Sequence, residues 1–330
     1  MYEFFGIDVS KDKLDLCWLR NISAKKPKNK VFENSFKSID HLSTWIKKVT
    51  KLYPKDICIT LESTGVYHES LIYFLHNEGF NIFLANPGKA KKYADSIGLK
   101  HKTDKLDSYM LAKFGYDQKD ILKLWKPDPV EIRELKALLS RLGALEKDRQ
   151  REKNRLEASE FNNVSGRVIQ SLKDIIKTLE NEISNLNKDI DDHIDKYPHL
   201  KEKNKLLKSI VGVGDVIARE MTYILSAKHF KNAKEVAAYL GLIPKIRESG
   251  KQRGKVTLSK AGSSRIRAKL YMAAVSASTY NKDINAQKQR LLANGKTKMQ
   301  ALGAAMRKLV QICFGVVKNG TEYKPQVVVN

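Results

Sequence analysis

The apolar positions in the first 120 or so residues follow two alternating periods. Runs of strand length are expected over residues 2–9, 13–19, 31–36, 57–61 and 81–85. Helical spacing is expected over 38–52 and 67–77, between the last three of these strands. Three strands in a meander, followed by alternating helix and strand, favour a mixed-sheet α/β domain of the ribonuclease-H kind. A Rossmann fold begins with parallel βαβ units and fits this order less well.

The next part of the chain has a helical period over a long distance. From Val130 to Ile194 there is no proline, and Lys, Glu and Leu dominate. Apolar residues recur there at intervals of 4, 3, 4, 3, 4 and 4, at Leu172, Ile176, Leu179, Ile183, Leu186, Ile190 and Ile194. This spacing is close to a heptad seam. With an interruption at 162–166, it predicts two antiparallel helices that form a coiled-coil arm or dimerisation element, and an ordinary helical bundle is the alternative.

The last 125 or so residues are rich in small residues and are expected to be mostly helical, with helices over 264–276 and 297–314. Gly212-Val213-Gly214 lies between two helical patterns, over 203–209 and 215–225. Such a turn can expose backbone N–H groups to a phosphate without reading sequence. Tight packing of the two helices explains the glycines equally well.

The charge balance narrows the range of partners. The chain has 61 Lys+Arg against 37 Asp+Glu, a formal net charge of +24. A polyanion is therefore the expected partner, ahead of an anionic membrane surface. With 42% hydrophobic residues the chain can build cores, so wholesale disorder is excluded.

The same composition gives expectations about the compartment. No apolar run reaches the ~20 residues of a membrane helix, and the N-terminus does not resemble a signal peptide. The three cysteines lie far apart without a CxxC pair, so neither a disulfide framework nor a zinc site is expected. We expect a soluble intracellular protein, with no membrane partner.

Four acids are candidates for chemistry. Asp8 and Glu62 each end an apolar strand, and Asp104 and Asp107 begin a predicted helix capped by Thr103. Residues three apart share one helix face, so both carboxylates of that pair can point at one spot. Carboxylates gathered at the sheet edge need a cation, and hard oxygen ligands select Mg²⁺ or Mn²⁺. Two such ions ~3.5–4 Å apart would clamp the attacking and leaving oxygens of a phosphodiester.

Basic residues are concentrated in two parts of the sequence, near the Asp104 and Asp107 pair and in the last third of the chain. Near the Asp pair, candidate phosphate contacts are Lys102 and Lys105. A second stretch, from Lys245 to Lys269, has nine basic residues and one acid. A solvated face usually mixes signs, so phosphate contact is favoured there. The candidates in this stretch are Lys251, Arg253, Lys255, Lys260, Arg265 and Arg267.

Serine residues in this basic stretch are the possible nucleophiles. A serine hydroxyl attacks poorly unless its proton is removed or a cationic site stabilises the incoming phosphate. Ser249 precedes Gly250 in a predicted loop, and its rivals are Ser259, Ser263 and Ser264. Ser263 or Ser264 is better explained as the cap of the helix that follows Gly262. The residues alone leave this choice open.

Taken together, these residues resemble the DEDD transposases of insertion sequences, the one-ten family. The resemblance covers nearly the whole chain in six ordered blocks. They are Gly6–Lys11, Leu61–Tyr67, Asn86-Pro87 followed by Lys102–Asp107, Ile210–Gly214, Tyr239–Pro244 with Ser249-Gly250, and Ser259–Leu270.

The resemblance implies a domain plan and a set of functional residues. It implies an RNase-H-like (RuvC-like) domain over 1–126, a coiled-coil arm over 127–203, and a mostly helical transposase domain over 204–330 that carries a helix-hairpin-helix-like segment and the serine loop. It assigns the acidic tetrad that binds Mg²⁺ to Asp8, Glu62, Asp104 and Asp107. It makes Ser249 the nucleophile that forms a covalent phosphoserine link with DNA.

The resemblance also implies partners. Members act as recombinases on double-stranded donor and target DNA, guided by a structured non-coding RNA from their own element. They assemble as dimers and tetramers in which different protomers contribute the acids and the serine. The first alternative is a RuvC-like nuclease in which metal-activated water cuts nucleic acid without a protein–DNA bond. The second is a non-catalytic nucleic-acid scaffold built on the helical arm.

Overall fold

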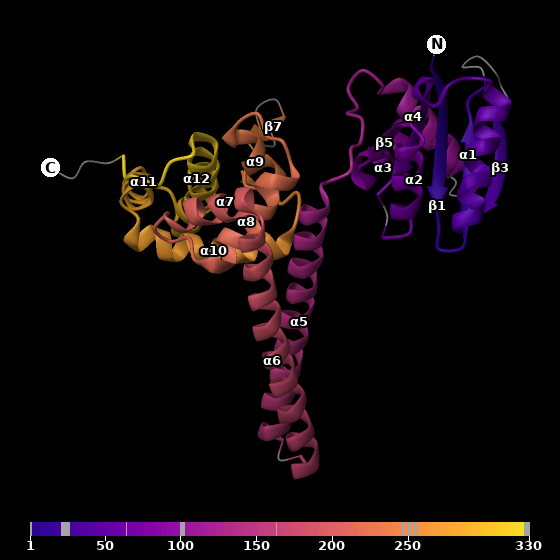
Figure 1. Ribbon diagram of the computed structural model, residues 1–330. Coiled ribbons are helices and arrows are strands. Elements are labelled where there is room, and N and C mark those ends of the chain that lie inside the picture. Colours follow the sequence, from indigo (N-terminus) through magenta and orange to yellow (C-terminus); the bar gives the residue numbers. More distant parts are fainter. Residues whose placement is uncertain are drawn as a thin grey trace. The chain divides into compact units, whose positions relative to one another are not determined.

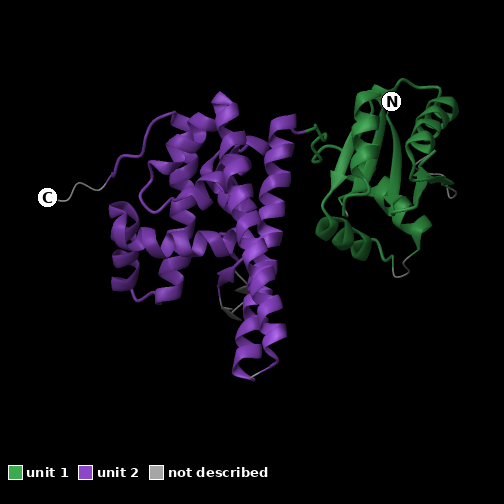
Figure 2. Ribbon diagram, turned by 60° about the horizontal axis from the view of Figure 1, so that its bottom comes forward, with its two compact units in different colours: residues 1–127 green, residues 128–330 purple. Residues whose placement is uncertain are grey.

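The computed structural model describes residues 2–20, 27–63, 65–99, 103–162, 164–245, 248–249, 252–253 and 256–326. The chain divides into two compact units, residues 1–127 and 128–330 (Figure 2). The boundary falls between Pro127 and Asp128, in a segment of extended chain that precedes a long helix.

The first unit is built on one five-stranded mixed sheet (Figure 1). Its strands are β1 (Glu3–Val9), β2 (Lys13–Trp18), β3 (Lys28–Glu33), β4 (Ile57–Glu62) and β5 (Asn81–Ala85), in the order β3-β2-β1-β4-β5. The pairs β1–β2 and β2–β3 are antiparallel, whereas β1–β4 and β4–β5 are parallel. A meander followed by parallel strands is the order expected of a ribonuclease-H-like domain, so the predicted fold class is confirmed.

One face of this sheet carries the main apolar core of the unit. Alternate strand residues, among them Phe5, Leu16 and Ile59, are fully or almost fully buried there. They pack against α1 (Phe36–Thr50) and α2 (Glu69–Asn77), through residues such as Leu42 and Leu71. A short 3₁₀ turn, η1 (Pro54–Asp56), leads into β4.

The opposite face of the sheet packs against α4 (Asp104–Asp117) at very short range. A Cβ atom on Gly6 of β1 would lie 2.1 Å from the carbonyl oxygen of Ser108 and 2.3 Å from the backbone nitrogen of Ala112. A Cβ atom on Gly115 of α4 would lie 2.0 Å from Oγ1 of Thr60 in β4. Only glycine fits at these two positions, so the helix backbone lies almost directly on the sheet. The remaining helix of this unit, α3 (Pro87–Ser96), also contacts α4.

The second unit begins with a helical hairpin (Figure 1). Helices α5 (Val130–Phe161) and α6 (Gly166–Lys196) pack along each other through an apolar seam that includes Leu135, Leu142 and Ile190. This agrees with the two helices predicted from the sequence. Apolar residues near the turn end of the hairpin are exposed, among them Phe161, Val168 and Ile175.

The rest of the second unit is a helical cluster with two short β-ribbons. Its helices are α7 (Pro198–Lys208), α8 (Asp215–Ala227), α9 (Ala233–Tyr239), α10 (Ser264–Tyr280), α11 (Lys282–Ala293) and α12 (Lys298–Asn319). They share a core that includes Met221, Leu270 and Leu309. Strand β6 (Pro244–Lys245) pairs with β9 (Thr257–Leu258), and β7 (Glu248–Ser249) pairs with β8 (Gln252–Arg253). Across the described residues, every helix is too short or too polar to cross a membrane.

Candidate active site

The four predicted acids lie on three elements that meet at one edge of the first unit's sheet. Asp8 is the second-last residue of β1, and Glu62 is the last residue of β4. Ile7 pairs with Leu61 in the parallel register, so Asp8 and Glu62 lie next to each other at the carboxyl ends of adjacent strands. Asp104 and Asp107 occupy the first turn of α4, which Thr103 caps by accepting a hydrogen bond from the Leu106 N–H at 3.3 Å.

The electrostatics of Asp8 show that these acids act on one another. Burial, as the largest cause, and the negative charges of Asp107, Asp104, Asp15 and Glu62 together raise the pKa of Asp8 to about 6. The two glycine contacts hold the middle and the C-terminal part of α4 close to β1 and β4, which places the start of the same helix near the ends of these strands. The other three predicted acids therefore lie near enough to Asp8 to act on its carboxyl group.

Asp15 is a fifth acid at this edge, and the sequence analysis did not select it. It lies on β2 directly opposite Asp8 and is only 6% exposed. In β2 the residues Leu14, Leu16 and Trp18 alternate with Asp15 and Cys17, so Asp15 lies on the face opposite the main core. No local pattern indicates that α4 covers that face and buries Asp15, because this depends on contacts between distant segments.

Lys13 supplies a positive charge inside this acidic group. Its ammonium donates to Oδ2 of Asp104 at 2.5 Å and lies 3.1 Å from Oδ2 of Asp15. These contacts, first that with Asp104 and then that with Asp15, raise the pKa of the Lys13 ammonium. Lys13 thus links β2 to the start of α4 and offsets part of the repulsion between the carboxylates.

The donor set fits a hard divalent cation in its chemistry. The candidate ligands are all carboxylate oxygens, the type that Mg²⁺ and Mn²⁺ prefer. Within the described ranges, however, no three acidic, histidine or cysteine side chains are grouped closely enough to hold a metal ion as they stand. One of the candidate ligands, Asp104, is paired with Lys13.

The predicted serine nucleophile belongs to the second unit. Ser249 lies in the two-residue strand β7, where its backbone pairs with Gln252 of β8. The sequence predicted a loop here, and the observed ribbon differs because the backbone groups of this polar segment pair with each other. Arg253 pairs with Glu248 in the same ribbon. Lys102, Lys251 and Lys255 lie outside the described residues.

The remaining predicted phosphate contacts fall into two groups. Lys105 on α4 and Lys260 before α10 are exposed, and Lys260 adopts a left-handed φ of 55°. Arg265, in contrast, donates to the Leu139 carbonyl oxygen at 2.9 Å and lies 3.1 Å from a carboxylate oxygen of Glu220.

Two of the predicted phosphate contacts, Arg265 and Arg267, form hydrogen bonds and ion pairs with other groups of the protein. The Glu220 side chain is 1% exposed, so Arg265 helps to neutralise a buried charge between α8 and α10. Arg267 donates to the carbonyl oxygens of Ala261 and Gly262, each at 2.9 Å, and so fixes the loop that leads into α10. Ser263 caps that helix, as the sequence predicted.

The glycine turn between α7 and α8 has a packing role. Gly212 has a φ of 95°, and a Cβ atom there would lie 2.8 Å from Cα of Ala277 in α10. Of the two explanations that the sequence left open, close packing therefore applies to Gly212. A Cβ atom on Gly214 would meet nothing within 4 Å, and this residue precedes the first turn of α8.

A mixed sheet that gathers acids from two strand ends and one helix start defines an α/β protein with a carboxylate site at its sheet edge. Residues 5–159 match a family model described as "Transposase", that of the DEDD transposases of IS110. Residues 204–289 match a second model, described as "Transposase IS116/IS110/IS902 family". The two matches cover roughly three quarters of the chain, and the protein belongs to the IS110 family of DEDD transposases.

Individual proteins are also similar to the chain. The pilin gene-inverting proteins of Moraxella bovis and Moraxella lacunata are each 28% identical to the chain over 331 residues, which covers 98% of the chain and 98% of each relative. The solved structure of T. thermophilus RuvC in complex with a Holliday junction substrate covers 38% of this chain and 100% of that chain, at 12% identity and a TM-score of 0.29.

Proposed function

We propose that this transposase is an RNA-guided, Mg²⁺-dependent DNA recombinase that cuts and rejoins strands through a serine–DNA link. The observation that carries the proposal is the convergence of Asp8, Glu62, Asp104 and Asp107 on one edge of the sheet, in a chain of the IS110 family. Mn²⁺ is the substitute that the same oxygen ligands would accept.

The acids would prepare the phosphodiester for attack. Asp8, Glu62, Asp104 and Asp107 would hold the metal, and Asp15 would keep Asp8 in a strongly negative environment. When bound, the divalent cation would neutralise charge that develops on the scissile phosphate. The carboxylate of Asp104 would have to exchange its ion pair with Lys13 for this task, so Lys13 would compete with the metal for one ligand.

Ser249 would carry the covalent step. Its Oγ would form a bond to phosphorus while the bond from phosphorus to one sugar oxygen breaks and the serine proton leaves. Attack by a sugar hydroxyl of the second strand would then release Ser249 and rejoin the DNA, so no free ends would accumulate. Exposed basic residues on both units, such as Lys105 and Lys260, would bind the phosphates beside the reacting one.

Three partners follow from this proposal. Double-stranded donor and target DNA and a structured non-coding guide RNA are polyanions, which suits the net charge of +24. The third partner is a second copy of the chain, in a dimer or tetramer held through the α5–α6 arm. The exposed apolar residues near the turn of that hairpin, including Val168 and Ile175, support such an assembly.

The test is trapping of the covalent link. Protein, guide RNA and labelled cognate DNA are incubated with Mg²⁺ and separated on a denaturing gel. We expect a protein–DNA adduct that Ser249→Ala abolishes, whereas Ser264→Ala, a matched change at an exposed position at the start of α10, retains it.

The other outcomes separate the alternatives. Cutting by the Ser249→Ala variant without any adduct would contradict the serine step and favour a nuclease that uses activated water. Full function in Glu62→Ala and Asp104→Ala would favour a non-catalytic scaffold. Sequencing of RNA that co-purifies with the protein tests guidance, and we expect a discrete transcript from the DNA that flanks the gene.

A further inference from the structure

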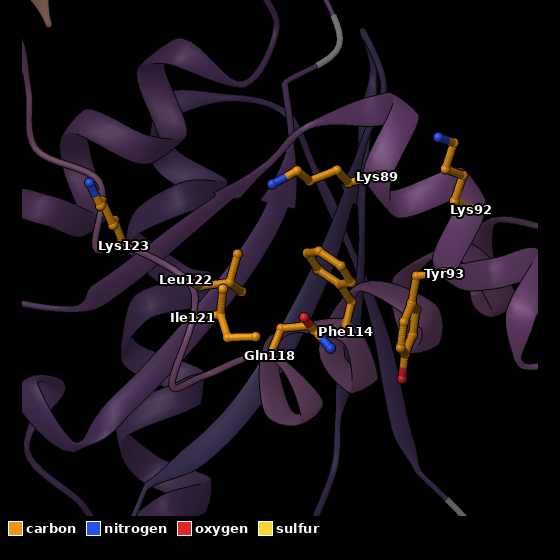
Figure 3. Close-up of a pocket in the computed structure, with 8 residues that line it drawn as sticks. All are labelled: Lys89, Lys92, Tyr93, Phe114, Gln118, Ile121, Leu122 and Lys123. Atoms are coloured by element: carbon orange, nitrogen blue, oxygen red, sulfur yellow. The ribbon is translucent and has the colours of Figure 1, made fainter. Parts of the chain in front are cut away.

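A pocket of about 540 Å³ opens on the first unit, away from the acidic group. It lies between α3, the C-terminal half of α4 and the segment that follows α4 (Figure 3). Its lining residues are Lys89, Lys92, Tyr93, Phe114, Gln118, Ile121, Leu122 and Lys123. The volume is in the ~300–1,000 Å³ range of pockets that hold small molecules or single groups of larger ligands.

The floor of this pocket is apolar and partly aromatic. Figure 3 shows the Phe114 ring and the side chains of Ile121 and Leu122 facing the same space. The Phe114 ring is fixed, because it is 5% exposed and meets the edge of the Tyr93 ring at a centroid distance of 5.2 Å. Ile121, in contrast, is 75% exposed, so its side chain offers apolar surface that a ligand in the pocket can contact.

The rim of the pocket is positive. The Lys89 ammonium extends over the floor, and Lys92 and Lys123 stand at opposite margins (Figure 3). Within the described part of the chain, none of these three lysines has an ion-pair partner, although other lysines of the same unit do, such as Lys47 with Glu78. Three unpaired ammonium groups around an apolar floor match a ligand with a flat apolar body and negative charge at its margin.

An unpaired nucleotide has this chemistry. A base can lie on an aromatic and aliphatic surface whatever its sequence, while lysines bind the flanking phosphates, which is how sequence-tolerant single-strand sites work. The Gln118 amide, which also lines the pocket, can donate to or accept from a base edge of either kind. The other uncharged polar group among the lining residues, the Tyr93 hydroxyl, is engaged in a hydrogen bond that it donates to Asp117.

Helix α4 connects this pocket to the candidate active site. Asp104 and Asp107 lie in the first turn of the helix, and Phe114 and the C-cap residue Gln118 follow 7 to 14 residues further along, which corresponds to about 10–21 Å at 1.5 Å per residue. Both sites therefore belong to one rigid element. A strand whose phosphate lies at the acids can reach the pocket within a few nucleotides.

We propose that this pocket binds an unpaired nucleotide of the DNA strand that is cut, a few nucleotides from the scissile phosphate. The inference rests on the proposed DNA-cleaving function, since the transposase must open its duplex substrate before strands can be exchanged. Holding one unstacked base at a fixed distance from Asp104 would fix the register of the strand in the site. The pocket would do this without reading the base, which leaves the choice of sequence to other contacts.

The test compares two triple variants of the full chain that lose the same charge. The pocket variant is Lys89→Gln, Lys92→Gln and Lys123→Gln. The control is Lys37→Gln, Lys48→Gln and Lys55→Gln, three exposed lysines in and just after α1, on the other side of the sheet. The probe is a fluorescent oligothymidine of about 12 nucleotides, which is within the site sizes of single-strand binders, measured by anisotropy over a range of salt.

We expect the pocket variant to bind the probe about tenfold or more weakly than the control. The slope of log K against log salt should be shallower by about 2, because each phosphate contact on a single strand contributes ~0.7. Ile121→Ser, which changes only exposed apolar surface, should weaken binding severalfold without changing that slope. A 4-thiothymidine probe should crosslink to the peptide that contains residues 114–123.

Equal affinity and equal slope in the two triple variants would overturn the proposal. So would crosslinks that map elsewhere, or oligouridine that binds through the pocket more tightly than oligothymidine, which would assign the pocket to RNA.

The serine–DNA adduct is measured separately. If the pocket variant still forms the adduct and binds single strands as the control does, the pocket proposal is rejected and the proposed function is not. The expected result is that Ser249→Ala loses the adduct and still binds single strands through the pocket. Pocket binding in a protein that never forms an adduct would reject the proposed function alone.

Discussion

At the scale of single residues, Asp8 is the group most affected by the architecture of the site. The pKa of folded Asp8 is about 6, whereas an unfolded aspartate has its ordinary pKa of 3.8. The folded state therefore binds more protons between these values, and stability falls as pH rises through this window. The cause is burial first and the neighbouring carboxylates second.

This fall in stability with rising pH leads to a prediction for Asp8→Asn in metal-free buffer. The amide removes a destabilising charge, so the variant should be more stable than the parent at pH 7.5, by on the order of 1 kcal/mol after allowance for solvent screening. At pH 5 the parent is already largely protonated and the gain should be smaller. Thermal denaturation in EDTA at both pH values measures the difference. Asp12→Asn, in an exposed turn, is the control, and a gain that does not depend on pH would contradict this explanation.

At the scale of elements, the distance between α4 and the sheet decides where the acids lie. In Gly6→Ala, the new methyl group would overlap the Ser108 carbonyl and the Ala112 nitrogen, which are backbone atoms and cannot rotate away. We expect the helix to shift, with a loss of stability of about 1–3 kcal/mol. A displacement of about 1 Å at Asp104 and Asp107 should lower adduct formation by up to ~100-fold.

The matched control is Gly166→Ala in the first position of α6, where a Cβ atom would meet nothing within 4 Å. It should leave both melting temperature and adduct formation unchanged. If Gly6→Ala also retained adduct formation, the close approach of α4 would not be what sets the geometry of the acids.

The elements also show what the sequence could and could not predict. Periodicity and caps were sufficient for the sheet, for the start of α4 at Thr103 and for the α5–α6 hairpin, because these depend on local patterns. The helix α3 is not among the elements expected from the sequence, because Asn86-Pro87-Gly88 has the composition of a turn, whereas in the structure Asn86 caps the helix and Pro87 is its first residue. Asp15, Lys13 and the internal role of Arg265 depend on contacts between distant segments, which no local pattern contains.

At the scale of the whole molecule, the acids and the serine of the proposed chemistry are in different compact units. The acids belong to residues 1–127, and Ser249 belongs to residues 128–330. The family resemblance implies that one protomer supplies the acids and another the serine. A symmetric dimer with such composite sites would contain two of them, each built from both chains.

Mixing two inactive variants tests this arrangement. Asp104→Asn keeps Ser249 and loses an acid, while Ser249→Ala keeps the acids and loses the nucleophile, so neither should form an adduct alone. In mixed dimers, one of the two composite sites has both intact parts, and about a quarter of all sites should be active after random exchange. The two chains are given tags of different size, so that a denaturing gel shows which one carries DNA. The DNA should be attached only to the Asp104→Asn chain, because its Ser249 shares a composite site with the intact acids of the partner chain. No adduct after proven subunit exchange would mean that acids and serine act within one chain.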